Sequence, residues 1–191
     1  MFDRLRNSVR RWIGGERLVI WYDPAYRLPL ASVEGQTGMD PRRTDLVATY
    51  LIDRGVITHM DLRTPSRIRY HELARVHDEK LLESLHDPKT LSDVFAVDPS
   101  DIVVDEVLHA VRLACGGTLD AARAALAQSG PTLNLLGGFH HAGPRRAGGF
   151  CVLNDIAVAI QALRAEGFRK RVVILDLDAH REVVPYRPRP A

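Results

Sequence analysis

The chain has 191 residues, of which 46% are hydrophobic and 26% are charged, and its formal net charge is +2. This length is sufficient for one domain with its own core, and the balanced charge argues against general nucleic-acid binding. Two cysteines are too few for a disulfide framework, and no apolar run approaches the length of a transmembrane helix. We therefore expect one domain in the cytoplasm, with both thiols reduced and no membrane partner.

The first 17 residues form a basic, mildly amphipathic segment, in which Phe2, Leu5 and Trp12 fall near one helical face. A membrane-surface or transit helix shares this pattern, but Asp3 and the short length argue against it. We interpret residues 1–17 as a basic N-terminal extension.

From residue 18 onward the sequence predicts alternating strands and helices. In chain order these are a strand over 18–22, a helix over 42–54 that ends at Gly55, a short strand over 56–62, helices over 70–85 and 101–114, a break at Gly116-Gly117, a helix over 119–128 with Thr118 as its N-cap, a strand over 133–136, a helix that begins at Asn154 or Asp155 and ends at Gly167, and a strand over 171–177. This alternation predicts an α/β fold with a parallel sheet flanked by helices.

Acidic residues and a histidine end the last predicted strand. The run over 171–177 is rich in Val, Ile and Leu, which is typical of a strand buried on both faces. Asp176, Asp178 and His180 follow at a spacing of two, which places them on one side of its carboxyl end, where open parallel sheets bind ligands. Carboxylate and imidazole together suit a zinc-type ion. A strand end with solvated charges is the alternative interpretation.

His140 and His141 follow the strand predicted over 133–136, in a loop with glycines on both sides. The glycines allow the backbone to approach a ligand closely. Two adjacent imidazoles cannot both be buried without hydrogen-bond partners, so the pair indicates either a site or a solvated surface loop. Asn154 and Asp155 open the next helix, and we assign them a structural, capping role.

Three blocks in this order resemble the histone deacetylase family, within the arginase/deacetylase superfamily. They are Gly-Gly-Phe-His-His-Ala over 137–142, Gly-Phe-Cys-Val-Leu-Asn-Asp over 149–155 and Asp-Leu-Asp-Ala-His over 176–180. The Gly-Gly-Phe-Cys form and the Arg-rich composition favour class IV-like or bacterial deacetylase-like members. The resemblance extends over residues 18–180 and implies the N-terminal part of a three-layer arginase/deacetylase-like domain.

The resemblance implies a zinc-dependent deacetylase that hydrolyses acetyl-lysine or a similar acyl-amide. His140 and His141 would be the catalytic pair, with His141 as general base. Asp176 would hydrogen-bond His140 and hold its orientation. Phe150 would form a wall of the acyl channel, and the Gly149 carbonyl would contact the substrate amide. An acetylated lysine protein and a small acyl-amine both remain candidate substrates.

Asp178 and His180 would be zinc ligands, and Asp176 would share a potassium site with them. The family pattern then continues with Gly-x-Gly, whereas this chain has Arg-Glu-Val-Val-Pro over 181–185. Asp178 is the last Asp of the chain, so the third zinc ligand of the family has no counterpart here. The tyrosine that stabilises the oxyanion in the family also has none.

We therefore interpret residues 181–191 as a non-homologous tail and the C-terminal part of the domain as missing. A base lost just after the His180 codon would produce such a tail. We expect weak or no activity from this chain alone, because two protein ligands hold zinc poorly. The alternatives are a non-catalytic truncated remnant and a half-domain completed by a separate C-terminal chain.

Overall fold

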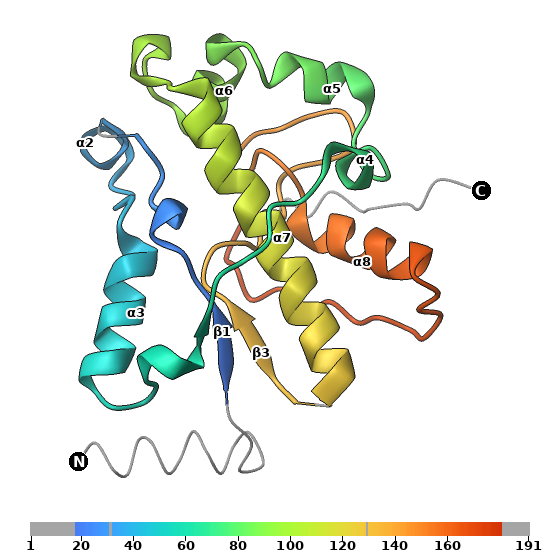
Figure 1. Ribbon diagram of the computed structural model, residues 1–191. Coiled ribbons are helices and arrows are strands. Elements are labelled where there is room, and N and C mark those ends of the chain that lie inside the picture. Colours follow the sequence, from blue (N-terminus) through green and yellow to red (C-terminus); the bar gives the residue numbers. More distant parts are fainter. Residues whose placement is uncertain (1–17, 31, 129, 181–191) are drawn as a thin grey trace.

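The computed structural model describes residues 18–30, 32–128 and 130–180, arranged as Figure 1 shows. The predicted extension (1–17) and tail (181–191) lie outside the described residues. The strands are β1 (Val19–Trp21), β2 (Leu62–Arg63) and β3 (Thr132–Asn134). The helices are α2 (Val33–Thr37), α3 (Arg43–Asp53), α4 (Tyr70–Leu73), α5 (Glu79–Ser84), α6 (Pro88–Phe95), α7 (Val104–Gln128) and α8 (Asp155–Ala165), with 3₁₀ turns η1 (Pro24–Tyr26), η2 (His59–Asp61) and η3 (Pro99–Asp101). None of these helices is long and apolar enough to cross a membrane.

The three strands form a parallel sheet in the order β2-β1-β3. Ile20, in the central strand, pairs with Leu62 on one side and Leu133 on the other. β-branched and aromatic residues make up β1, and its Ile20 is fully buried. The α7 helix crosses the sheet beside β1 and β3 (Figure 1). The predicted α/β fold with a parallel sheet flanked by helices is confirmed.

The predicted break at Gly116-Gly117 is wrong, because α7 runs without interruption from Val104 to Gln128. Both glycines serve close packing instead. A Cβ on Gly117 would lie 2.2 Å from the Tyr26 hydroxyl, so only glycine lets η1 approach the helix this closely. Thr118 is therefore a mid-helix residue rather than an N-cap, and its hydroxyl donates to Asp155 at 2.6 Å.

The helix predicted over 42–54 is confirmed as α3, whereas the one predicted over 70–85 divides into α4 and α5. Between them the chain turns so that His77 is buried and the Asp78 amide donates to the Pro144 carbonyl at 2.8 Å. The strand predicted over 56–62 is wrong for most of its length. Most of that stretch consists of a turn and η2, and β2 begins only at Leu62.

The buried strand predicted over 171–177 is also wrong. Residues 171–178 form neither helix nor strand, and Val173 and Leu175 are 89% and 79% exposed. A strand forms only where neighbouring backbone groups pair with it. Within the described ranges the sheet ends at β3, and no strand pairs with this run. Val172, Val173 and Ile174 line a shallow apolar pocket with residues of α7 and α8, but they remain 42%, 89% and 57% exposed.

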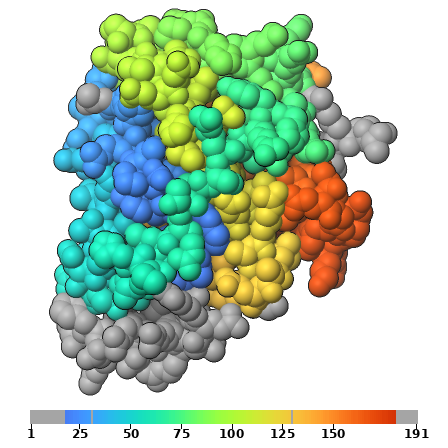
Figure 2. All heavy atoms as spheres, viewed as in Figure 1, coloured from blue at the N-terminus to red at the C-terminus, as the bar shows by residue number. Residues whose placement is uncertain are grey.

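The core consists of two clusters of buried apolar side chains. The larger one lies between α7, α8 and the short helices α4 to α6, and it includes Phe95, Val111 and Val158. In the space-filling view, α8 lies against the flank of α7 (Figure 2). The smaller cluster includes Phe139 and Cys151 and lies around the segment that carries the histidine pair. The loop that carries His140 and His141 is therefore packed against buried side chains and is not an isolated surface loop.

Candidate active site

The two predicted histidines lie in the loop that follows β3, which we call the histidine loop (residues 137–143). Gly138 has a φ of +76°, which glycine adopts without strain, and the His140 amide donates to the Gly138 carbonyl at 2.8 Å. The rings of His140 and His141 meet edge to face, with centroids 4.1 Å apart. The His140 side chain is only 12% exposed, so it is not the solvated histidine of the alternative interpretation.

Asp176 lies beside the pair, as the resemblance implied. Its carboxylate is 2.6 Å from Nδ1 of His140, across 36 residues of sequence. In a neutral imidazole this contact places the proton on Nδ1 and leaves Nε2 as an acceptor. The hydrogen bond from His140, aided by the Asp178 amide, lowers the pKa of the Asp176 carboxyl. Asp176 is thus positioned to fix the orientation of the His140 ring.

Asp178 and His180 lie next along the chain and contact each other. The His180 amide donates to Oδ1 of Asp178 at 2.8 Å, and its Nδ1 is 2.6 Å from the same oxygen. These contacts lower the pKa of the Asp178 carboxyl. The His180 ring is 5.8 Å from that of His141, centroid to centroid. Both residues therefore face the histidine pair across a short gap.

Gly149 and Phe150 form the tip of a tight turn. Gly148 and Cys151 exchange backbone hydrogen bonds of 3.0 Å, and the two residues between them have φ values of +56° and +61°. Positive φ at both central positions is the pattern of a type I′ turn, in which Phe150 is an unusual residue. A Cβ on Gly149 would lie 2.8 Å from Cδ2 of His141, so the turn packs directly against that ring.

One pocket of about 540 Å³, the histidine pocket, is lined by six of the seven predicted site residues. They are His140, His141, Gly149, Phe150, Asp178 and His180. The seventh, Asp176, reaches it through His140. The structure thus brings together residues that the sequence separates by up to 40 positions.

Other residues of the histidine pocket were not predicted individually. Met39 and Arg43 line it from the loop before α3 and from the first turn of α3. Neither residue belongs to the three motifs that carry the family resemblance, so the sequence carried no individual signal for them. Cys151 also lines it, as a free thiol whose pKa burial raises to about 11. A thiol with so high a pKa is a poor nucleophile at neutral pH.

The donor set only partly fits a zinc ion. One carboxylate and one imidazole, from Asp178 and His180, are ligand types that zinc prefers. Catalytic zinc sites usually have three protein ligands, and within the described parts of the chain no group of three or more His, Cys, Asp or Glu side chains could hold a metal. Among the described residues, the donor set for a catalytic zinc ion is therefore incomplete.

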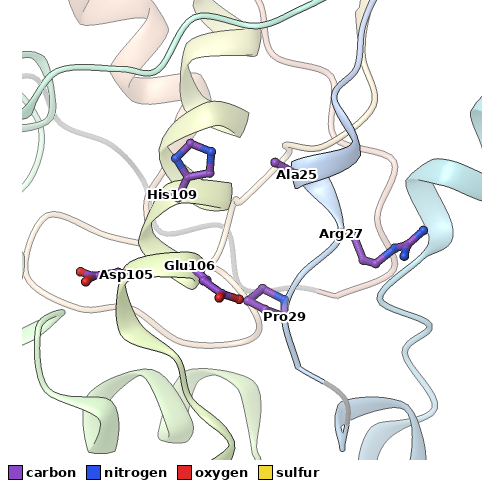
Figure 3. Close-up of a pocket in the computed structure, with 6 residues that line it drawn as sticks. All are labelled: Ala25, Arg27, Pro29, Asp105, Glu106 and His109. Atoms are coloured by element: carbon purple, nitrogen blue, oxygen red, sulfur yellow. The ribbon is translucent and has the colours of Figure 1, made fainter.

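A second pocket of about 350 Å³ lies between η1 and the first turns of α7 (Figure 3). It contains Asp105, Glu106 and His109 on the helix and shares no lining residue with the histidine pocket. Arg27, at its edge, forms an ion pair with Asp45 of α3. None of the predicted site residues lies here.

The fold agrees with the comparisons to known proteins. The sequence profile of the histone deacetylase domain matches residues 37–181, and the chain belongs to this family. It is 31% identical over 169 residues to histone deacetylase 2 of Arabidopsis thaliana, which covers 86% of this chain and 43% of the relative. It is 29% identical over 152 residues to human histone deacetylase 1, which covers 74% of this chain and 31% of the relative.

The crystal structure of the HDA15 HD domain is similar in fold, with a TM-score of 0.59 and 23% sequence identity. The match covers 80% of this chain and 44% of that one. The chain thus spans less than half the length of each of these proteins.

Proposed function

We propose that this chain carries part of the active site of a zinc-dependent deacetylase, which hydrolyses acetyl-lysine or a similar acyl-amide. One observation carries the proposal: the histidine pair and the Asp178–His180 pair, which come from separate motifs, line the same pocket. Membership of the histone deacetylase family supports the same reaction.

Within this pocket we assign the general base to His141. Its ring lies between His140, which Asp176 orients, and His180, an expected metal ligand. A base must reach both the attacking water and the leaving amine, and this intermediate place suits it. Zinc in a completed site would polarise the acyl carbonyl and supply hydroxide near neutral pH. We assign no step of the reaction to this chain alone.

The substrate would enter beside Phe150 and Gly149, whose turn forms one wall of the pocket. An acetylated lysine side chain and a small acyl-amine both carry the amide and the slender alkyl stem that such a pocket suits. The potassium site of Asp176, Asp178 and the His180 backbone and the cytoplasmic location stay predictions. Nucleic acid and membrane are not proposed as partners.

A second candidate is a half-domain that a separate C-terminal chain completes, or a remnant without catalysis. The incomplete donor set of the described residues favours it. On either version, we propose that the chain alone is weakly active or inactive.

Metal content and turnover, measured on one preparation, test the proposal. The purified, dialysed chain should contain well under one equivalent of zinc by mass spectrometry and should release little acetate from an acetyl-lysine peptide. Adding a polypeptide that corresponds to the C-terminal half of a family member should raise both. A full equivalent of zinc with clear turnover by the chain alone would contradict the half-site, and no turnover under any complementation would contradict the deacetylase assignment.

A further inference from the structure

The first two residues of the α8 region hold the histidine loop on both sides of the pair. Asp155 binds the part of the loop that precedes the pair: its carboxylate accepts from the amides of Gly138 at 3.1 Å and Phe139 at 2.8 Å. Asn154 donates from Nδ2 to the Ala142 carbonyl, after the pair, at 2.9 Å. The backbone that carries both imidazoles is therefore fixed at each end by one helix N-terminus.

Asp155 is 1% exposed, which is rare for a carboxylate. Burial raises the pKa of Asp155, whereas the Thr118 hydroxyl and the two loop amides stabilise its charged form. A carboxylate that accepts from successive backbone amides occupies the place of an anion in a backbone nest. A Cβ on Gly137 would lie 2.6 Å from its Oδ2, so the loop approaches this carboxylate as closely as glycine permits.

The carboxylate is itself held by a chain of hydrogen-bonded side chains that are buried or half-buried. Thr118 of α7 accepts from Nδ2 of Asn134 at 2.9 Å, and Oδ1 of Asn134 accepts from the Tyr26 hydroxyl at 2.6 Å. The same Nδ2 also donates to the Ala114 carbonyl of α7 at 2.9 Å. Asp155 thereby links the histidine loop, through hydrogen bonds, to η1, β3 and α7.

His77 holds the end of the histidine loop that follows the pair. Its Nδ1 donates to the Gly143 carbonyl at 3.0 Å, and its Nε2 accepts from the Asn154 amide at 3.1 Å. Burial lowers its pKa to about 4, so the ring is neutral near pH 7 and can both donate and accept. Asn154 caps α8 by accepting from the Ala157 amide at 2.9 Å, which leaves its Nδ2 available for the loop.

We propose that Asp155 and Asn154 are positioning residues, which set the places of the His140 and His141 rings relative to Asp176. The catalytic meaning of this geometry rests on the proposed function, but the geometry itself does not. Capping of α8 explains only the Oδ1 contact of Asn154. The contacts from Asp155 to the loop amides and from Asn154 to Ala142 serve the loop alone.

The test uses nuclear magnetic resonance of the ¹⁵N-labelled chain, because the Nδ1 proton of His140 reports its contact with Asp176. Asp155→Asn keeps the size of the side chain but cannot accept from both amides. Asn154→Asp keeps the cap, since Asp and Asn cap equally well, but removes the donor to Ala142. Val158→Ala is the control for lost stability, because Val158 is a fully buried α8 residue of the larger core cluster.

In the wild-type chain we expect a slowly exchanging, downfield His140 Nδ1 proton. Both Asp155→Asn and Asn154→Asp should accelerate its exchange with water roughly tenfold, which corresponds to the loss of an ordinary hydrogen bond. Val158→Ala should lower the melting temperature and leave this proton as in the wild type. The readout requires no turnover, so it stands or falls separately from the deacetylase assignment.

The proposal is overturned if the wild-type chain shows no protected His140 proton, or if both loop variants keep the wild-type exchange rate. It is also overturned if Val158→Ala changes that rate as much as they do, because a general loss of stability would then explain the effect.

Discussion

Gly116, in the middle of α7, lies directly against the backbone of Ser66. A Cβ built on this glycine would be 1.6 Å from the Ser66 carbonyl oxygen, and backbone cannot move aside as a flexible side chain can. Glycine usually weakens a helix interior, so its presence here reflects the close packing of another segment. The segment before α4 therefore reaches α7 only because this position has no side chain.

Replacement of Gly116 by Ala should destabilise the chain by more than about 4 kcal/mol, because the added methyl group forces the two backbones apart. Urea denaturation measures this loss. Gly35→Ala in the exposed helix α2 is the matched control, since nothing lies within 4 Å of its Cβ. It should stabilise the chain by about 0.5–1 kcal/mol through helix propensity. Equal effects of the two variants would argue against the packing explanation.

Stability should fall as the pH is lowered from about 6.5 to about 4, in part through His77. Burial lowers its pKa to about 4, so in this window the unfolded chain binds a proton that the folded chain does not. The stabilisation is present above the unfolded pKa and is lost as the pH falls, by roughly 3 kcal/mol. Chemical denaturation at a series of pH values measures the slope.

The matched variant for this pH effect is His77→Gln, which can donate to Gly143 and accept from Asn154 but does not titrate. The difference in slope between it and the wild type isolates His77. This comparison matters because Asp155, whose pKa is raised by burial, contributes the opposite slope above its unfolded pKa. Identical slopes for the two proteins would show that folding does not lower the pKa of His77.

The apolar run over 172–177 should tolerate charge. Because Val173 and Leu175 are 89% and 79% exposed, we expect Val173→Lys and Leu175→Lys to change the free energy of unfolding by no more than about 0.5 kcal/mol. Both should reduce aggregation, which light scattering measures, because exposed apolar segments tend to associate. Ile20→Ala, fully buried in β1, should instead cost about 2–5 kcal/mol. A large loss of stability from Leu175→Lys would show that the run is packed.

Zinc binding by the chain alone should depend on Asp178 and His180. Mutation of a residue that only orients a metal ligand lowers metal affinity by about 10–100-fold. Asp178→Ala and His180→Ala remove expected ligands themselves, so each should lower zinc affinity by at least this factor. Competition with a chromophoric chelator measures the dissociation constant. His109→Ala, at the exposed second pocket, should leave it unchanged. A similar loss in all three variants would indicate non-specific binding to surface histidines.

Local patterns predicted the elements whose signals lie within a few residues. Helix α3 ends at Asp53, two residues before Gly55, and Asn154 caps α8, because caps and hydrophobic periodicity act along the chain itself. The same local rules predicted a break at Gly116-Gly117, whereas α7 continues through both glycines. Glycine is needed there because segments distant in sequence pack closely against the helix. The local rules also misled over 171–177, since an apolar run becomes a strand only when another strand pairs with it.

The sequence alone determined the family and the α/β class, because motif identity and residue type are properties of the chain. Only the tertiary structure decided that the histidine pair and the Asp178–His180 pair share one pocket. It also revealed that Asp155, which local patterns assign to a helix terminus, binds the histidine loop. The physical reason is that a buried carboxylate must find donors wherever the fold places them, and those donors, unlike a cap, need not be close in sequence.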